Sequence, residues 1–388
     1  MNVLMLTIRM QQGYGVSEVI GAIAPELESL GVGCHVGAMF TDDAFGDLDV
    51  RLVEPTPEAV ASLAAKVGAE VVVAHGSPFL EVLPGLPEGL VTVAWEHGEP
   101  TPEFFTDDAA ERREIIERIR ASVYPQVDHV VAISEFVRHD IGWPQASVII
   151  NGADHVPDLG TKLWVPPRPD AGRLRVGCLV RLGEGEAFYK GRELLGVLRA
   201  ELDRLEVPAD LEVMGRGTPQ DASRLESEGF VVHLNATDEE RTDFLRGIDV
   251  FVSPSKWEGC NLPLVEAAAL GTPGLALDTG AHPEFTPLVY ANLTLLALQV
   301  RAYAEDPALL RAHGDLCYRY VRSGMRWSFT AAALVDVIAG GQGRPLSRRA
   351  AASGRWQARA AAVKRVWQRE GAAGTTRKVW QKVKARVR

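Results

Sequence analysis

The stretch SPSKWEGCNLPLVEAAALGTPGLALDTGAHPE, residues 253–284, contains a strand end, a loop and a helix in succession. The apolar run at 248–252 has the length of a buried parallel strand, and the Ser-Pro-Ser that follows breaks it. Pro263 stands where the first turn of a helix tolerates proline, and Gly-Thr-Pro at 271–273 ends the helix. This order predicts a loop that directs the backbone N–H groups of a helix start beyond the carboxyl end of a sheet.

Two carboxylates, Glu258 and Glu266, lie eight positions apart in this stretch, the first in the loop and the second in the helix. Either residue alone is more often a solvated charge, and an acid in a first helical turn is also stabilised by the helix dipole. The two acids together, in a strand-loop-helix unit, favour a binding site over that ordinary interpretation.

The stretch resembles the signature of family 4 glycosyltransferases, retaining enzymes of the GT-B architecture, in which Glu-Gly-Phe-Gly-Leu-Pro precedes Glu-Ala. The resemblance implies that Glu258 faces the transferred sugar and that Glu266 hydrogen-bonds the nucleotide ribose. Cys260 and Asn261 replace the family's Phe-Gly. Because asparagine tolerates a left-handed backbone, we expect the chain path at position 261 to be kept. Asn261 and Leu262 are expected to line the substrate pocket, and the replacement is expected to affect the choice of sugar.

Composition bounds the class of protein. At 388 residues the chain is long enough for two domains, and 46% hydrophobic with 24% charged residues is ordinary for a soluble globular protein. The four cysteines are far apart, which predicts neither a disulfide framework nor a metal knuckle and fits a reducing compartment. The first apolar run is too short for a signal peptide, and no stretch approaches the about 20 apolar residues of a membrane span.

Strand-like and helix-like segments alternate along the chain, which predicts parallel sheets covered by helices on both faces. The predicted fold is α/β of the GT-B type, with two facing, doubly wound, Rossmann-like domains and a cleft between them. We expect an N-terminal, acceptor-side domain at 1–156, a proline-rich linker at 157–172, a C-terminal nucleotide-sugar-binding domain at 173–325, a crossover helix at 326–341 and a basic amphipathic tail at 342–388.

The expected elements of both domains follow from the same patterns. The expected strands are 3–8, 32–39, 70–74, 90–95, 129–133 and 147–150, then 174–179, 211–214, 230–233, 250–252 and 274–277, and the expected helices of the first domain are 17–30, 57–67, 108–122 and 135–141.

Glycines and basic residues after the strands predict where the donor phosphates bind. Gly13 and Gly15 open a helix, so their amides can approach an anion closely. A glycine turn without a ligand is the alternative, since Glu18 stands where a dinucleotide fingerprint has its third glycine. The resemblance implies that Arg181 and Lys190 clamp the diphosphate and offset its roughly two negative charges. A solvated basic pair is the alternative interpretation there.

Two further features complete the predicted pocket. Gly215, in a Gly-Arg-Gly turn, and Asn235 resemble the family's nucleobase side, although glycine turns after parallel strands are common structural features. His97 ends a strand on the cleft side, and the resemblance gives it a contact with the donor sugar or phosphate. A lone histidine is more often structural. His75 is a weaker candidate of the same kind.

The resemblance implies an enzyme, a retaining hexosyltransferase that moves a hexose from a nucleotide-sugar donor to a glycan or lipid-linked acceptor in cell-surface glycan biosynthesis. The expected catalytic residues are Glu258, His97, Lys190 and Arg181, acting by a front-face route in which a leaving phosphate oxygen takes the acceptor proton. No cofactor and no metal is expected. Two alternatives stay open: a sugar-nucleotide epimerase or hydrolase of the same fold, and a non-catalytic sugar-nucleotide-binding protein.

The net charge of −10 is distributed unevenly along the chain. Residues 342–388 carry 14 Lys and Arg against one acid, which leaves −23 for residues 1–341. Trp356, Val363 and Trp367 recur at helical spacing among the basic residues, a pattern typical of helices on anionic membranes. A tail that is disordered or docks on the acidic body is the alternative. We predict a cytoplasmic protein, peripheral at the inner face of the membrane, and no nucleic-acid partner, because no base-reading module is present.

Overall fold

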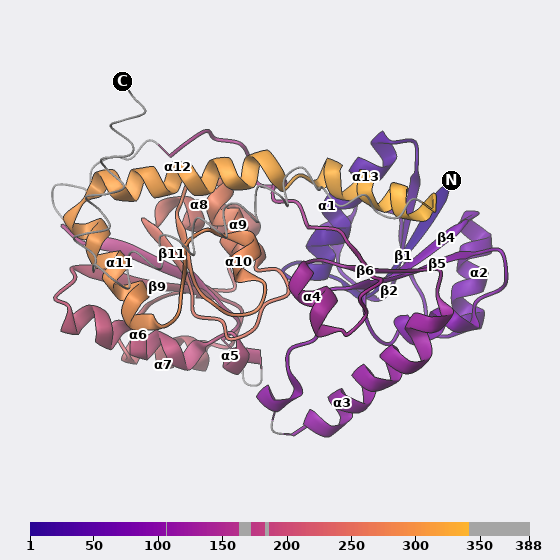
Figure 1. Ribbon diagram of the computed structural model, residues 1–388, viewed down its shortest axis with the longest axis horizontal. Helices are drawn as coiled ribbons and strands as arrows, with labels where there is room; N and C mark the ends of the chain where they lie inside the picture. Colours follow the sequence, from indigo (N-terminus) through magenta and orange to yellow (C-terminus); the bar gives the residue numbers. More distant parts are fainter. Residues whose placement is uncertain (106, 163–171, 183–185, 341–388) are drawn as a thin grey trace. The chain divides into compact units, whose positions relative to one another are not determined.

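The structure, a computed structural model, describes residues 1–340 apart from 106, 163–171 and 183–185. Two sheets, each with all strands parallel, organise this part of the chain (Figure 1). The seven strands of the first sheet are β1 (Asn2–Met10), β2 (Gly33–Thr41), β3 (Val50–Leu52), β4 (Val71–Ala74), β5 (Val91–Glu96), β6 (His129–Ala132) and β7 (Ser147–Val148). The six strands of the second are β8 (Leu174–Leu179), β9 (Ala209–Gly215), β10 (Val231–Leu234), β11 (Val250–Ser253), β12 (Gly274–Leu277) and β13 (Val289–Tyr290).

Both sheets are doubly wound. Their strand orders are β3-β2-β1-β4-β5-β6-β7 and β10-β9-β8-β11-β12-β13, so the winding direction reverses between β1 and β4 and between β8 and β11. Ligands of such sheets bind beyond the carboxyl ends of the strands at these reversal points. The predicted architecture of two parallel α/β sheets is confirmed, and the reversal points lie where the candidate residues after β1, β8 and β11 are found.

Helices connect the strands of both sheets. In the first half they are α1 (Gly15–Ser29), α2 (Pro57–Val67), α3 (Ala109–Arg118) and α4 (Glu135–Asp140), with 3₁₀ turns at Asp43–Phe45, Leu80–Gly85, Pro102–Phe104 and Tyr124–Gln126 and a π turn at Ile119–Val123. In the second half they are α5 (Glu186–Tyr189), α6 (Arg192–Arg204), α7 (Pro219–Ser227), α8 (Asp238–Gly247), α9 (Leu262–Ala269), α10 (His282–Phe285), α11 (Leu293–Glu305), α12 (Pro307–Gly324) and α13 (Trp327–Ile338).

Helix α2 shows how local chemistry sets an element. Its N-cap Thr56 accepts a hydrogen bond from the Ala59 N–H at 3.2 Å, Pro57 stands in the first turn, and Gly68 ends the helix with φ at 64°. The sequence predicted both ends of this helix. The predicted helix at 108–122 is divided, because α3 passes into a π turn after Arg118.

Two short edge strands, β3 and β13, were not predicted. β13 has two residues, too few for a recognisable pattern. Polar and apolar residues do alternate over 47–52, which includes β3, so the sequence held a strand signal there that the prediction missed. Both are defined by pairing with a neighbour, β3 with β2 and β13 with β12.

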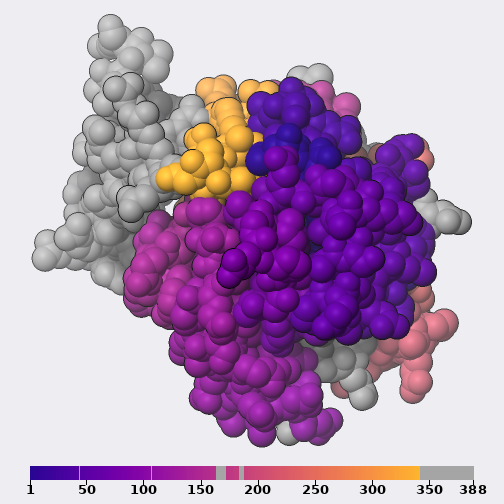
Figure 2. All heavy atoms as spheres, turned by 90° about the vertical axis from the view of Figure 1, so that its right-hand side faces the viewer, coloured from indigo at the N-terminus to yellow at the C-terminus, as the bar shows by residue number. Residues whose placement is uncertain are grey.

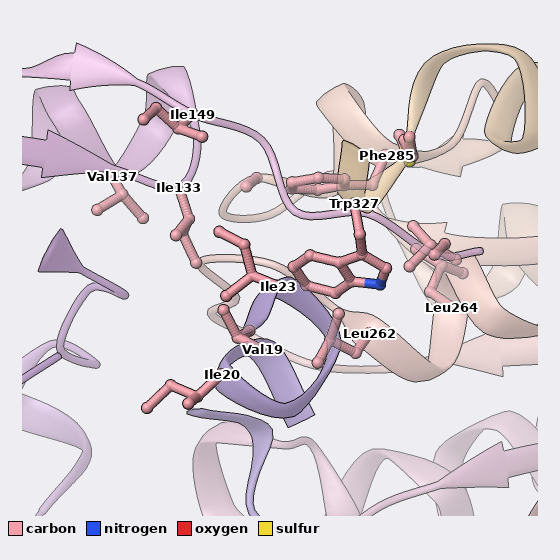
Figure 3. Close-up of a cluster of buried hydrophobic side chains, with 14 of the residues drawn as sticks. Val19, Ile20, Ile23, Ile133, Val137, Ile149, Leu262, Leu264, Phe285 and Trp327 are labelled. Carbon is pink, nitrogen blue, oxygen red and sulfur yellow. The ribbon is translucent and has the colours of Figure 1, made fainter. Parts of the chain in front are cut away.

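The last described helix, α13, returns to the first sheet and packs on α1 (Figure 1). In the space-filling view of Figure 2, the yellow end of the described chain lies against indigo N-terminal residues. Trp327, at the start of α13, lies among Val19 and Ile23 of α1 and Leu262 and Leu264 of α9 (Figure 3). The indole is 2% exposed, so this contact is part of the core.

The two sheets occupy separate parts of the chain. The first sheet spans residues 2–148 and the second 174–290; the predicted domain boundaries stay predictions. The basic tail at 342–388 lies outside the described residues. Within the described residues, no helix has the length and apolar character needed to span a membrane. All four cysteines are free thiols.

Candidate active site

Lys190 and Glu258 form an ion pair after strands β8 and β11. Lys190 Nζ lies 2.9 Å from each carboxylate oxygen of Glu258, and the two side chains are 25% and 5% exposed. Burial opposes the charge on Lys190, but the Glu258 carboxylate outweighs burial and raises the pKa of Lys190 above its ordinary value. Two predicted catalytic residues, 68 positions apart, therefore meet in one charged pair.

Backbone contacts fix the loop that carries Glu258. The Ala281 N–H donates to the Glu258 carbonyl at 2.8 Å. Gly280 adopts φ of 55°, and a Cβ there would lie 2.6 Å from both the N and the O of Glu258. On its other side, a Cβ on Gly259 would collide with the carbonyl oxygen of His97. Glycine at 259 and 280 thus allows the loop to be held closely between β5 and α10.

Asn261 holds the Glu258 loop through hydrogen bonds of its side chain. Its φ is −87°, so the position does not use the left-handed conformation that asparagine tolerates, and Asn261 is the N-cap of α9. Its Oδ1 accepts from the Leu264 N–H at 3.2 Å, and its Nδ2 donates to Ser253 Oγ at 2.7 Å and His282 Nε2 at 3.1 Å. The side chain is 6% exposed and lies behind Glu258, with Nδ2 3.5 Å from Glu258 Oε1.

Glu266 is completely buried in α9. Its Oε1 accepts a hydrogen bond from His155 Nε2 at 3.0 Å and lies 3.7 Å from an Arg241 nitrogen. Its Oε2 has no hydrogen-bond partner among the described residues. Burial disfavours the charge, but Arg241 and His155 outweigh burial and hold the pKa of Glu266 below its usual range. The carboxylate is therefore ionised and keeps one oxygen available.

The glycine turn after β1 meets basic residues of the second sheet. Gly13 adopts φ of 75°, and a Cβ there would collide with the guanidinium of Arg216, whose Nη2 would lie 2.6 Å away. The Arg181 guanidinium carbon lies 5.3 Å from the centre of the Tyr14 ring. A Cβ on Gly15 would have Leu262 Cδ1 as its nearest neighbour, at 4.0 Å.

The structure thus brings the predicted Gly13, Gly15, Arg181 and Leu262 together and adds Arg216. Sequence reasoning missed Arg216, although the residue stands between the two glycines of the predicted turn. The available signal was a cation in a turn after a parallel strand, where anions bind.

Gly215 and Asn235 shape that turn. A Cβ on Gly215 would collide with the Val180 carbonyl, so only glycine fits. Asn235 exchanges two hydrogen bonds with the backbone of Gly217, its Oδ1 accepting from N–H and its Nδ2 donating to the carbonyl, both at 3.1 Å. Asn235 also adopts φ of 54°, which asparagine tolerates. Both residues hold the backbone on which Arg216 is mounted.

His97 pairs with the second candidate histidine. His75 Nδ1 lies 2.9 Å from His97 Nε2, and Trp95 stacks on both rings. Burial lowers the pKa of His97 to about 4 and that of His75 well below its usual range. Both rings are therefore neutral near pH 7, one donating and the other accepting. In addition, a Cβ on Gly98 would lie 2.7 Å from the Trp257 ring, which places this strand end against the Glu258 loop.

The second half of the chain is similar to known glycosyltransferases. Residues 184–305 match the family described as "Glycosyl transferases group 1". Two similar curated proteins are "MMP alpha-(1->4)-mannosyltransferase" of Mycolicibacterium hassiacum, 30% identical over 207 residues, 47% of each chain, and the lipopolysaccharide core biosynthesis mannosyltransferase LpcC of Rhizobium leguminosarum bv. viciae, 28% identical over 183 residues, 42% of this chain and 50% of LpcC. The chain spans about half the length of the curated relatives it matches.

Solved structures share the fold over most of this chain. Sucrose-phosphate synthase from Thermosynechococcus elongatus superimposes with a TM-score of 0.68 at 18% identity, covering 87% of this chain and 98% of its own. Anabaena HepE in complex with UDP and glucose superimposes with a TM-score of 0.65 at 16% identity, covering 88% and 100%. The GT-B fold and the resemblance to family 4-type glycosyltransferases, both predicted from the sequence, are confirmed.

No group of three or more His, Cys, Asp or Glu side chains in the described residues is arranged to hold a metal ion. The expectation that the reaction uses no metal and no cofactor stays a prediction.

Proposed function

We propose that the protein is a retaining glycosyltransferase that moves a hexose from a nucleoside diphosphate sugar to a glycan or lipid-linked acceptor. Glu266 is the observation that carries this proposal. A fully buried, ionised carboxylate needs hydrogen-bond donors on both oxygens, and Oε2 has none among the described residues. A ribose hydroxyl of the donor supplies that hydrogen bond.

The diphosphate binds between the glycine turn after β1 and three cations. Arg181 and Arg216 lie against Tyr14 and Gly13, and the amides of this turn open helix α1. Lys190 is the third cation and is already oriented by Glu258. Positive charge placed here before the reaction stabilises the nucleoside diphosphate as it leaves, which lowers the barrier without reorganisation during the chemical step.

The transferred hexose lies beside Glu258 and the strand end at His97. Glu258 accepts hydrogen bonds from sugar hydroxyls, and His97, neutral near pH 7, exchanges a hydrogen bond with the sugar or its phosphate. The acceptor hydroxyl attacks from the face that the phosphate leaves, and a leaving phosphate oxygen takes its proton. The C–O bond to phosphate breaks as the new glycosidic bond forms, so the anomeric configuration is retained.

Two similar proteins are named mannosyltransferases, one of them of lipopolysaccharide core biosynthesis, and the HepE structure holds UDP and glucose. These names support a hexosyl donor and a role in cell-surface glycan biosynthesis.

The test is transfer of labelled hexose by the full-length protein from GDP-mannose, UDP-glucose and ADP-glucose to lipid-linked glycans, with the anomeric configuration of the product read by NMR. We expect transfer with retention from one donor. Glu258→Gln should lower the rate at least about 100-fold, whereas Glu228→Gln, on an exposed helix end, should not change it. An epimerised sugar formed without acceptor, or no turnover of any donor, would overturn the proposal.

We also propose that residues 342–388, with a net charge of +13, bring the protein to the cytoplasmic face of an anionic membrane. Flotation with phosphatidylglycerol liposomes compares the full chain with a variant ending at 341. Loss of flotation in the shortened chain is expected, and equal flotation of both would overturn this part of the proposal.

A further inference from the structure

A chain of partly buried hydrogen bonds leads from the return helix α13 to Glu266. The indole N–H of Trp327 donates to His155 Nδ1 at 3.0 Å, and His155 Nε2 lies 3.0 Å from Glu266 Oε1. An indole nitrogen can only donate, so Nδ1 of His155 must be the acceptor and the ring proton must be on Nε2. His155 therefore donates to Glu266, and Trp327 determines its tautomer.

The segment that carries His155 is pinned to the start of α13. The Trp327 backbone N–H donates to Asp154 Oδ1 at 2.8 Å, and the Ala153 N–H donates to the Met325 carbonyl at 3.0 Å. A Cβ on Gly152 would lie 2.6 Å from the indole of Trp327. His155 is thus fixed on both sides of its ring, by its own backbone segment and by the indole.

The indole itself is held in the core between α1 and α9. Figure 3 shows it among Val19, Ile23, Leu262 and Leu264, with its nitrogen on the side of Leu264. A side chain packed from two helices in this way cannot turn its N–H away from His155 without losing buried contacts. The direction of the hydrogen bond to His155 is therefore set by the packing of α13.

We propose that His155 is a positioning residue for the donor ribose, oriented by Trp327. By engaging Oε1, it fixes the rotation of the Glu266 carboxylate and leaves Oε2 as the oxygen that receives the ribose hydroxyl. Arg241, 3.7 Å from Oε1, keeps the carboxylate charged without replacing this directional bond. A side chain that binds a ligand keeps the correct orientation when neighbouring side chains hold it in place. This inference rests on the proposed function, since it assigns the ribose to Glu266.

The test compares how tightly the wild type and its variants bind nucleotides with and without one ribose hydroxyl. Calorimetry measures the dissociation constants of UDP, GDP and ADP and of their 2′-deoxy and 3′-deoxy forms, for the full-length wild type, His155→Ala, His155→Gln, Trp327→Phe and, as a control, His139→Ala, whose histidine is exposed on α4. The nucleotide that binds most tightly is used for the comparison.

We expect wild type to bind the ribonucleotide about 10- to 100-fold more tightly than the deoxy form that lacks the recognised hydroxyl, because a hydrogen bond to a charged group is lost. His155→Ala should weaken the ribonucleotide about 10-fold and leave the deoxy form unchanged, so the discrimination shrinks. His155→Gln, which keeps a donor, and Trp327→Phe, which frees the tautomer, should lie between. His139→Ala should match wild type.

Equal weakening of ribo and deoxy nucleotides by His155→Ala would overturn the inference, because a merely structural role affects both alike. Full discrimination in both His155 variants would overturn it as well. If wild type binds every nucleotide and its deoxy forms equally, the ribose assignment of the proposed function fails and the inference fails with it. The two failures are therefore distinguishable.

Discussion

Lys190 Nζ lies 2.9 Å from both carboxylate oxygens of Glu258, with Glu258 almost fully buried. The resemblance implied separate roles for these residues, one at the diphosphate and one at the sugar. The structure shows that each also neutralises the other before any donor is present. A change in one residue therefore acts on the folded state as well as on the reaction.

Lys190→Ala should abolish turnover and also destabilise the fold by up to about 3 kcal/mol, because Glu258 is left as an unpaired buried charge. Urea denaturation and donor turnover measure the two effects. The double variant Lys190→Met, Glu258→Gln should recover most of the stability but none of the activity. Turnover close to wild type in Lys190→Ala would contradict the role of Lys190.

Gly280→Ala should displace the Glu258 loop. Its φ of 55° and the 2.6 Å approach of a Cβ to the Glu258 backbone predict a loss of about 1–3 kcal/mol together with reduced turnover. Gly196→Ala is the matched control, because its Cβ meets nothing within 4 Å inside helix α6 and should stabilise the protein by about 0.5–1 kcal/mol. Thermal unfolding compares the two. A Gly280→Ala protein as stable as wild type would contradict this reading of the loop.

The two glycines of the turn after β1 should separate stability from binding. Gly15→Ala should leave the free energy of unfolding unchanged, because the nearest neighbour of the added Cβ is Leu262, at 4.0 Å. The same change should raise KM for the donor if the phosphates approach this helix start. Gly13→Ala should lower stability as well, since its φ of 75° and Arg216 leave no room. An unchanged KM in Gly15→Ala would place the phosphates elsewhere.

Much of the fold could be predicted from local chemistry. The strands Leu174–Leu179 and Gly274–Leu277 and the helix Pro57–Val67 have the ends that their apolar runs, caps and glycines predicted. The two-residue edge strand β13 could not be predicted, because pairing with β12 rather than its own pattern defines it. Strand β3 was missed although polar and apolar residues alternate over 47–52.

Individual residues of the candidate site could be proposed from the sequence, but the contacts between them could not. Glycine turns and charged residues after parallel strands indicated Gly13, Arg181 and Glu258. The pairing of Lys190 with Glu258, the contact of Arg216 with Gly13 and the bonds of His155 join segments far apart in the chain. Such partners depend on tertiary packing, which no local pattern encodes.

The neighbours Glu96 and His97 should affect the pH dependence of stability in opposite directions. Burial raises the pKa of Glu96 to about 7, while the Tyr124 hydroxyl donates to its Oε1 at 2.7 Å. The folded state therefore holds this proton more tightly than the unfolded chain, in which the pKa of Glu96 is 4.5. Protonation of Glu96 accordingly raises the free energy of unfolding as the pH falls from 7 to 4.5. The pKa of His97 is lowered from 6.5 to about 4, so His97 lowers the free energy of unfolding as the pH falls from 6.5 to 4.

Glu96 and His97 each change the free energy of unfolding by about 3 kcal/mol, in opposite directions, so their effects nearly cancel between pH 6.5 and 4.5. Glu96→Gln removes one of them and should make stability fall more steeply than in wild type over this range. Urea denaturation at pH 7, 6, 5 and 4.5 gives the comparison. Parallel pH profiles of the two proteins would show that Glu96 does not hold a raised pKa.

Binding of nucleoside diphosphates to wild type and Glu266→Gln tests the central claim most directly. Calorimetry with UDP, GDP and ADP should find one nucleotide that binds the wild-type protein. Glu266→Gln should bind it at least about 10-fold more weakly, because the His155 donor keeps the amide oxygen at the position of Oε1 and leaves the NH2 group, which cannot accept a hydrogen bond, at the position of Oε2. Binding of none of the three nucleotides, or equal affinity in the two proteins, would contradict the account.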